Sequence, residues 1–369
     1  MPVFVFVRIL LTLWMWTVRQ VIAEPVSPDP ILRPYLGVAI ETNAWLEPWQ
    51  RWDTLHYQAI AERGYAAFEG ALFTPPLYPN LMGLVASLTG MSTLVAGIVI
   101  SNLAYLGALL AFYKLALEEI KDDQAALRAT LYLALFPTSF FFLAAYTESL
   151  LLLGAALAIY AAHKRRWLKS GASAAVAALS RLVGATLVIP LGYAAVSEFR
   201  KSKSFRPLLA PIGAIAGAIV LPLYAWLGLG LDPLAPLRAQ TARFHGGFSI
   251  PGANLLQAFR RLALGEAFIA DAFDLVFLIL FIACGYFVWK KYSRMTAIYY
   301  VSMLSLYLVR VAGSQPLLGT SRYVLTLFPA FFVLAEWGRR PWVNRAILYT
   351  SIVGLLFLSG QFAIWGWVG

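Results

Sequence analysis

Long apolar runs separated by short polar segments constrain the fold of this 369-residue chain more than any other feature. Apolar residues make up 60% of the chain and charged residues 13%, about half the charged share of a soluble domain. Runs of about 20 apolar residues are long enough to cross a bilayer as helices. The sequence therefore predicts an all-α polytopic membrane protein, folded as a single domain over residues 1–369.

The apolar runs predict about ten or eleven membrane helices, some of them short or re-entrant. The run at residues 3–22 contains Arg8 and Arg19; it either spans, with both arginines reaching opposite interfaces, or serves as a signal peptide. Residues 170–198 have basic segments at both ends and predict two short helices that enter and return, broken near 180–184. The other expected spans are residues 92–116, 125–145, 147–163, 207–229, 267–289, 295–312, 322–338 and 345–366.

The basic residues predict one orientation. All eight lysines fall in four short segments between apolar runs, as is typical of cytoplasmic loops. The inner loops are then 117–124, 164–169, 199–206, 290–294 and 339–344; the outer segments are 23–91, 146–148, 230–266 and 313–321. We expect a cytoplasmic N-terminus, interfacial helices in the first outer loop (one at 76–88), and location in the plasma membrane if the protein is prokaryotic.

Composition also excludes several classes of function. The net charge of +11 is explained by these loops, and no basic, aromatic-interleaved segment suggests nucleic-acid binding. A single cysteine, Cys284, excludes an intrachain disulfide and a thiolate metal cluster. The three histidines are far apart and show no metal-ligand spacing. We expect no cofactor and no metal ligands, although the sequence leaves a requirement for a divalent ion open.

The polar segment 51–65, just after the first apolar run, is the strongest candidate for a functional site. Trp52, Asp53, His56 and Tyr57 stand together in it, in a region rich in acidic and tryptophan side chains. Aromatic rings stack on sugars, and a carboxylate can accept a hydroxyl proton. We therefore predict that Asp53 is a general base, with Trp52, His56 and Tyr57 in contact with substrate. The alternative is a helix cap with an aromatic anchor.

Two charged residues inside the apolar region are further candidates. Glu148 lies in a tight turn between two apolar runs, where an acidic residue is expected either to bind substrate or to cap a helix N-terminus. Arg181 stands alone in an apolar run, so it either faces a polar cavity or pairs with a carboxylate.

Outer arginines suggest a phosphate site. Arg238 and Arg243 lie in the large outer segment, and Arg322 with Tyr323 opens the run at 322–338. A guanidinium matches phosphate oxygens with two hydrogen bonds, and the N–H groups at the start of a helix favour an anion. We predict that these residues bind substrate and that Arg322 contacts a phosphate; interfacial anchoring is the alternative for each arginine.

Five motifs, in order along most of the chain, resemble the PIG-V-like group of mannosyltransferases, within the GT-C class of membrane glycosyltransferases. They are Trp52-Asp53-x-x-His56-Tyr57-x-x-Ile60-Ala61-x-x-Gly64-Tyr65, Phe73-Thr74-Pro75-Pro76-Leu77-Tyr78-Pro79, Leu135-Phe136-Pro137-Thr138-Ser139-Phe140-Phe141-Phe142 with Tyr146-Thr147-Glu148-Ser149, Ser180-Arg181-x-x-Gly184, and Ser321-Arg322-Tyr323-x-x-x-x-Phe328-Pro329.

This resemblance implies a specific reaction. A sugar, mannose in the eukaryotic members, would move from a polyprenyl-phosphate-linked donor to an acceptor on the outer side of the membrane, with inversion. The essential acidic residue of the class corresponds to Asp53, and a second acidic residue of many members corresponds to Glu148. The acceptor is left open: a lipid, a glycan or a protein.

Two other classes of function remain as alternatives. A transporter or flippase of lipid-linked sugars would also carry charges and broken helices inside the membrane, but its related halves would give a repeat, and none is visible. A purely structural membrane subunit would leave the acidic, aromatic segment around Asp53 unexplained.

Overall fold

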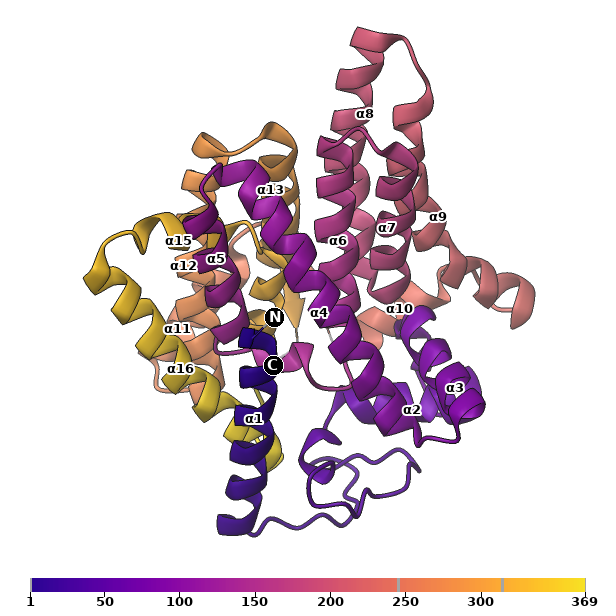
Figure 1. Cartoon of the computed structure of the whole chain (residues 1–369). Helices are drawn as coiled ribbons and strands as arrows, with labels where there is room; N and C mark the ends of the chain where they lie inside the picture. Colours follow the sequence, from indigo (N-terminus) through magenta and orange to yellow (C-terminus); the bar gives the residue numbers. More distant parts are fainter. Residues whose placement is uncertain (1, 244–245, 313–314, 369) are drawn as a thin grey trace.

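The computed structural model describes residues 2–243, 246–312 and 315–368, and its elements are almost all helices (Figure 1). The α-helices of the first half are α1 (Pro2–Val21), α2 (Asp53–Arg63), α3 (Leu77–Thr89), α4 (Thr93–Ile120), α5 (Asp123–Leu135), α6 (Glu148–His163), α7 (Trp167–Ser180) and α8 (Val188–Ser202). Those of the second half are α9 (Leu209–Leu223), α10 (Ala235–Arg243), α11 (Ala253–Ala263), α12 (Ile269–Lys291), α13 (Arg294–Val309), α14 (Thr320–Tyr323), α15 (Ala330–Trp337) and α16 (Pro341–Ala363). Two short strands, β1 (Gly246–Phe248) and β2 (Arg310–Ala312), pair antiparallel.

The all-α membrane fold is confirmed, but fewer helices than predicted are long enough to span. Within the described residues, six helical stretches have the length and apolarity for a full crossing. The prediction of a continuous span at 125–145 is wrong because α5 ends at Leu135, two residues before Pro137. The prediction at 322–338 is wrong for the same reason: Pro329 separates α14 and a 3-10 turn from α15. A proline disfavours helical backbone at the residue before it, so each run becomes two short pieces.

The predicted break near residues 180–184 is confirmed. Helix α7 ends at Ser180, Arg181 is extended with φ −150° and ψ 141°, and a 3-10 segment over Leu182–Leu187 leads into α8. The segment Leu182–Ser202 is nevertheless long enough to cross a membrane. The turn expected at 146–148 is not at a surface either, because residues 136–150 are all buried.

Close helix packing builds one side of the molecule, where α4, α6, α7 and α9 contact one another in succession. Gly171 of α7 and Gly213 of α9 make the tightest approach: a side chain at either position would collide with backbone of the other helix. Small residues let helix backbones approach in this way without any polar contact. The same side carries the 3-10 segment after Arg181, so this packing fixes its position.

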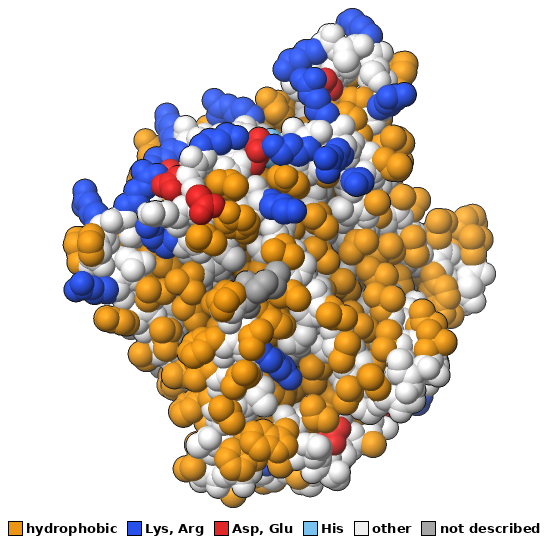
Figure 2. Space-filling model, in the orientation of Figure 1, with side chains coloured by type: hydrophobic (Ala, Val, Ile, Leu, Met, Phe, Trp, Pro, Cys, Tyr) orange, Lys and Arg blue, Asp and Glu red, His pale blue; other side chains and the backbone are white. Residues whose placement is uncertain are grey.

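The two predicted sets of loops lie at opposite ends of the molecule. Lysine and arginine side chains gather at the end that carries the α8–α9 connection, above a broad apolar band (Figure 2). The first outer loop, with α2 and α3, lies at the other end (Figure 1). The expected interfacial helix at 76–88 is present as α3. Which end faces the cytoplasm stays a prediction.

The two arginines of α1 do not extend to opposite interfaces, contrary to the expectation for a spanning segment. Arg8 turns inward, donates to the carbonyl of Leu143 at 3.2 Å and lies 4.5 Å from the ring centroid of Trp49. Arg19 pairs with Glu47 at 3.1 Å. Both arginines thus contact partners within the protein, so their side chains help to hold α1 against the rest of the molecule.

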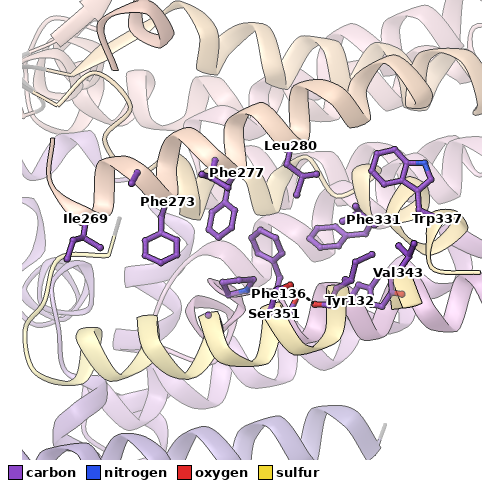
Figure 3. A pocket seen from close by; sticks show the side chains of 17 residues that line it. Tyr132, Phe136, Ile269, Phe273, Phe277, Leu280, Phe331, Trp337, Val343 and Ser351 are labelled. Carbon is purple, nitrogen blue, oxygen red and sulfur yellow. Dashed lines mark hydrogen bonds between the residues drawn. The ribbon is translucent and has the colours of Figure 1, made fainter. Parts of the chain in front are cut away.

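An apolar groove of about 520 Å³ lies between α12 and α16 (Figure 3). Phe273, Phe277, Phe331 and Trp337 are among its lining side chains, and none of its lining residues is charged. None of the residues predicted for the functional site lines it. The groove has no charged side chain that could pair with a phosphate or act as a base, so it does not contain the predicted catalytic carboxylate.

Candidate active site

Asp53 is the first residue of α2, and the residues beside it in space fix its position. Arg51 is fully buried; its guanidinium donates twice to the carbonyl of Ala363, at 2.8 and 3.1 Å, and pairs with Glu47 at 2.5 Å. The hydroxyl of Tyr146 donates to the carbonyl of Arg51 and accepts from the N–H of Asp53, both at 3.2 Å. A buried arginine and a buried tyrosine thus tie the start of α2 to the membrane helices.

The backbone immediately before Asp53 is strained. Trp52 has φ +49° and ψ −115°, a conformation that residues other than glycine rarely adopt. Its ring packs edge-on against Trp365 at 5.5 Å and Trp367 at 5.1 Å between centroids. Such strain costs about 1–3 kcal/mol and persists only where the surroundings enforce it. The three tryptophans therefore hold the turn that directs Asp53.

Four charged side chains from separate parts of the chain form one continuous row. Arg322 Nη1 donates to Asp53 Oδ2 at 2.6 Å, and Arg322 Nε donates to Glu148. Arg181 donates to the same oxygen of Glu148. The row alternates in sign, and Asp53 is its most exposed member, with 31% of its side chain accessible against 4% for Arg322. A reacting molecule can therefore reach Asp53 more easily than its partners.

Breaks in the helices bring these side chains inward. Arg181 stands at the extended residue between α7 and its 3-10 continuation, and Glu148 opens α6 after a non-helical segment. Arg322 lies in the short helix α14, whose Ser321 N–H donates to buried Asp274 Oδ1 at 2.6 Å. Irregular backbone at membrane depth is tolerated where it is enclosed by protein or lines a cavity.

Aromatic rings enclose Arg322. Its guanidinium carbon lies 4.5 Å from the ring centroid of Tyr146 and 4.9 Å from that of Phe141. Rings at this distance attract a cation and exclude water around it. Its two ion pairs therefore form in a largely water-free environment, where electrostatic attraction is stronger than in solution.

The same arginine controls the protonation of Asp53. Burial alone would raise the pKa of this carboxyl, but Arg322, assisted by His56 and Arg181, outweighs burial and holds the pKa of Asp53 below its usual value. Asp53 is therefore ionised at neutral pH, as a proton acceptor must be.

Two buried atoms of the row have no hydrogen-bond partner among the residues that the structure describes: Glu148 Oε2 and Arg322 Nη2. Buried polar atoms are nearly always satisfied, so such exceptions mark positions for water or a ligand. One is an acceptor and the other a donor. A hydroxyl group can serve both, because it donates through its hydrogen and accepts through its oxygen.

The predicted aromatic residues lie beside the row. His56 Nδ1 is 3.9 Å from Asp53 Oδ1, and the ring of His56 is buried. The hydroxyl of Tyr57 is 3.4 Å from Thr147 Oγ1, next to Glu148 in the chain. Tyr57 is buried as well, and contact of either side chain with substrate stays a prediction.

Beyond Arg181 the row borders a second cavity, of about 280 Å³. The guanidinium carbon of Arg181 lies 5.3 Å from the ring centroid of Tyr323, and that of Arg310 lies 4.7 Å from the same ring. All three residues line the cavity. The predicted residues Arg181 and Tyr323 are thus brought to the row, together with an arginine that the sequence analysis did not select.

Two predicted residues are not placed in the row. Arg238 is exposed and pairs with Asp232 at 2.7 Å, next to it on the surface. Arg243 ends α10, but its side chain lies outside the described residues. The acidic residues of the first outer loop also separate: Glu47 pairs with arginines, and Glu62 accepts from a threonine of α4 at 2.7 Å. Only Asp53 among these carboxylates belongs to the row.

Sequence reasoning missed Arg310, Tyr146 and Asp274. Arg310 and Asp274 each lie inside a predicted apolar run, the same signal that selected Arg181, and intramembrane charge is a functional indicator by default. Tyr146 carried no such signal, since buried tyrosines are common in apolar segments. In the described part of the chain no cluster of three or more metal-binding side chains occurs; Asp53 and Glu148 are instead bridged by Arg322.

Comparison with solved structures finds a similar fold in a membrane protein of known structure. ArnT from Cupriavidus metallidurans bound to undecaprenyl phosphate superposes with a TM-score of 0.53 at 14% identity, over 98% of this chain and 76% of that one. The oligosaccharyltransferase of Archaeoglobus fulgidus gives TM-scores of 0.42 in its apo form and 0.46 with zinc and sulfate, at 13% and 14% identity; 99% and 98% of this chain align with 55% and 53% of that chain.

The sequence itself identifies the family. Residues 2–209 match the family model described as mannosyltransferase (PIG-V), which is more than half of the chain. The protein therefore belongs to the PIG-V mannosyltransferase family and is a membrane glycosyltransferase, as the motifs around Asp53, Glu148 and Arg181 predicted. A search of curated proteins gave no match.

Proposed function

We propose that this glycosyltransferase moves mannose from a polyprenyl-phosphate donor to a hydroxyl acceptor outside the cytoplasm, with inversion, and that Asp53 is the general base. The observation that carries the proposal is the Asp53 carboxylate, kept ionised by Arg322 yet 31% exposed at the end of a buried charge row. The undecaprenyl phosphate bound to ArnT supports a lipid-phosphate donor by analogy of fold.

The reaction is a single displacement. The acceptor hydroxyl oxygen attacks the anomeric carbon and its proton passes to Asp53, while the bond from that carbon to the phosphate oxygen breaks. The electron pair of that bond stays on the phosphate, which leaves as polyprenyl phosphate. A positioned base typically accelerates such a step by about 10²–10⁴-fold. A donor of β configuration gives an α-linked product.

Arg322 acts on the base and not on the phosphate in this proposal. The sequence hypothesis placed the donor's phosphate at Arg322 and at free N–H groups of its helix. Arg322 is instead enclosed between Asp53 and Glu148, and the Ser321 N–H already bonds Asp274. Two carboxylates beside one guanidinium would repel an incoming phosphate. Arg322 therefore orients and ionises Asp53 through Nη1, and its second terminal nitrogen, Nη2, is left for a neutral hydroxyl group.

The acceptor hydroxyl, or a hydroxyl of the sugar, is proposed to bind between Glu148 Oε2 and Arg322 Nη2. Both atoms lack a partner in the described residues, and both belong to side chains that adjoin Asp53 through the row. This assigns Glu148 to substrate orientation.

Purified protein in detergent tests the proposal when incubated with radiolabelled polyprenyl-phosphate mannose and a membrane lipid extract. Label should move from the donor into a new product, and NMR of the product should show the anomeric configuration opposite to that of the donor. Parallel reactions with polyprenyl-phosphate glucose and with GDP-mannose separate donor classes. Transfer from GDP-mannose alone, or retention of configuration, would contradict the proposal.

A further inference from the structure

We propose that Asp274 and Thr138 are positioning residues for the transfer reaction, because together they fix the turn of chain from which Arg322 reaches Asp53. The inference rests on the proposed function, since its endpoint is Asp53 as the base. It gives a role to a buried carboxylate that is not a member of the charge row, and to a threonine of the motif at residues 135–142.

The turn that carries Arg322 needs support from other elements. Helix α14 spans only Thr320–Tyr323, and a single helical turn is marginal by itself because few backbone hydrogen bonds offset the loss of conformational entropy. Arg322 is buried and contacts two carboxylates at once, those of Asp53 and Glu148. Its backbone must therefore be held by neighbouring parts of the chain.

Ser321, the residue before Arg322, is held through all three of its polar groups. Its N–H donates to Asp274 Oδ1 at 2.6 Å, its carbonyl accepts from Thr138 Oγ1 at 2.8 Å, and its hydroxyl donates to the carbonyl of Val368 at 3.0 Å. The first partner lies in α12, the second between α5 and α6, and the third near the end of the chain. Three separate elements thus fix the backbone at the point where the Arg322 side chain begins.

The burial of Asp274 is explained by this contact. Asp274 lies in α12, a helix long and apolar enough to cross a membrane, and only 3% of the residue is exposed. Within the described residues it takes part in no ion pair. An ionisable group inside a membrane helix costs free energy and usually marks a functional contact. The contact that Asp274 makes is the one with the turn that carries Arg322.

Asp271, one turn earlier in α12, shows what a carboxylate with a purely structural role does in this helix. It accepts from the N–H of Phe268 at 2.9 Å, which caps α12 itself, and lies 3.9 Å from Arg261. Asp274 instead accepts from a residue 47 positions away in the chain. The two carboxylates are therefore a matched pair: both are buried in one helix, but only Asp274 holds α14.

Loss of this contact would act on the base through Arg322. A buried N–H without a partner is strongly disfavoured, so α14 is expected to shift until the N–H of Ser321 finds another acceptor. Arg322 would then lose its close approach to Asp53, which would be less well oriented and less readily ionised. A displacement of about 1 Å at a catalytic group can lower the rate about a hundredfold.

Replacing Asp274 by leucine tests the inference, because leucine is of similar size and cannot accept a hydrogen bond. In the full-length protein purified in detergent, kcat for mannosyl transfer should fall about ten- to a hundredfold. The acidic limb of kcat/KM should move to higher pH, toward the ordinary pKa of a free aspartate. Asp274→Asn keeps an oxygen acceptor and should recover most of the rate and the wild-type limb. Asp271→Leu, the matched control, should lower the melting temperature and leave the limb in place.

Thr138→Val provides a second test, which also decides the question if Asp274→Leu does not fold. It removes only the hydroxyl that donates to the Ser321 carbonyl, so the acidic limb should move in the same direction by a smaller amount. An acidic limb at its wild-type pH in every folded variant of Asp274→Leu and Thr138→Val would overturn the inference. So would a shift in Asp274→Asn as large as that in Asp274→Leu, because the charge and not the hydrogen bond would then set the limb.

Asp53→Asn separates failure of the inference from failure of the proposed function. Full transfer by Asp53→Asn would refute the proposed function, and the inference with it. Loss of transfer in Asp53→Asn, together with an unmoved acidic limb in Asp274→Leu and Thr138→Val, would refute the inference alone.

Discussion

Replacing Asp53 by asparagine tests its role as a base without changing the packing around it, because asparagine has the same shape but cannot accept the proton. A general base contributes about 10²–10⁴-fold to rate, which corresponds to about 3–5 kcal/mol of transition-state stabilisation. We expect kcat to fall by that factor. Donor KM should change little, because Asp53 is proposed to act on the acceptor hydroxyl and not on the donor.

The expected cost to folding is small. Asp53→Asn loses the ionic part of one hydrogen bond, that from Arg322 Nη1 at 2.6 Å, while Arg322 keeps its ion pair with Glu148. A hydrogen bond to a charged group contributes about 1.5–3 kcal/mol, and the 31% exposure of Asp53 reduces this to about 1 kcal/mol. The melting temperature should therefore fall by about 2–4 °C or less.

Initial rates of mannosyl transfer and thermal unfolding in the same detergent measure both quantities. Glu62→Gln is the matched control: Glu62 is also in α2, its side chain is 34% exposed, and it lies outside the row. This control should retain wild-type activity. If folded Asp53→Asn transferred mannose at more than about a tenth of the wild-type rate, a loss below the range expected of a base, Asp53 could not be the base.

Three further predictions use the same protein. Because Arg322 lowers the pKa of Asp53, the acidic limb of kcat/KM should lie below the ordinary pKa of a free aspartate. The stabilisation from this pair is present above that ordinary pKa and is lost as pH falls through the lower native pKa. Arg322→Met should move the limb to higher pH, and an unmoved limb would assign it to another group. Gly171→Ala should destabilise the α7–α9 contact by about 1–3 kcal/mol in thermal unfolding, whereas Gly192→Ala, where an added methyl meets nothing within 4 Å, should not; equal melting temperatures would contradict the packing described. In a Cys284→Ser background, an impermeant thiol reagent applied to intact cells should label Asn43→Cys and not Ser202→Cys, and the opposite pattern would place Asp53 in the cytoplasm.

The class of fold and the family could be predicted from the sequence, because both depend on short stretches of neighbouring residues. Apolar runs predict membrane helices, and motifs such as that around Asp53 are recognised by the spacing of their residues along the chain. Two spans were predicted wrongly because of prolines. The runs at 125–145 and 322–338 look continuous by hydropathy, yet Pro137 and Pro329 divide them. Hydropathy indicates whether a segment can lie within the membrane. It does not indicate whether the helix formed by that segment is continuous.

The row of charges itself could not be read from the sequence. Arg322 and Asp53 are 269 residues apart, and pairing between them depends on how α2, α6 and α14 meet. The sequence analysis therefore treated Arg181 and Glu148 as separate candidates, each with pairing or capping as the alternative. In the structure the alternatives combine: Arg181 pairs with Glu148, and the pair is part of the candidate site.

The tie between Arg51 and Ala363 joins residues 312 positions apart, and the carbonyl of Val368 accepts from Ser321 Oγ at 3.0 Å in the same region. The loop that presents Asp53 is therefore completed only after α16 has inserted and residues 363–368 have folded back over Trp52. Contacts of such high sequence separation form late, because a long loop must close first. During synthesis the early helices can already be in the bilayer while the enzyme is still inactive. We therefore expect activity to require the C-terminal residues, and truncation after Ala363 should abolish mannosyl transfer although every charged member of the row remains.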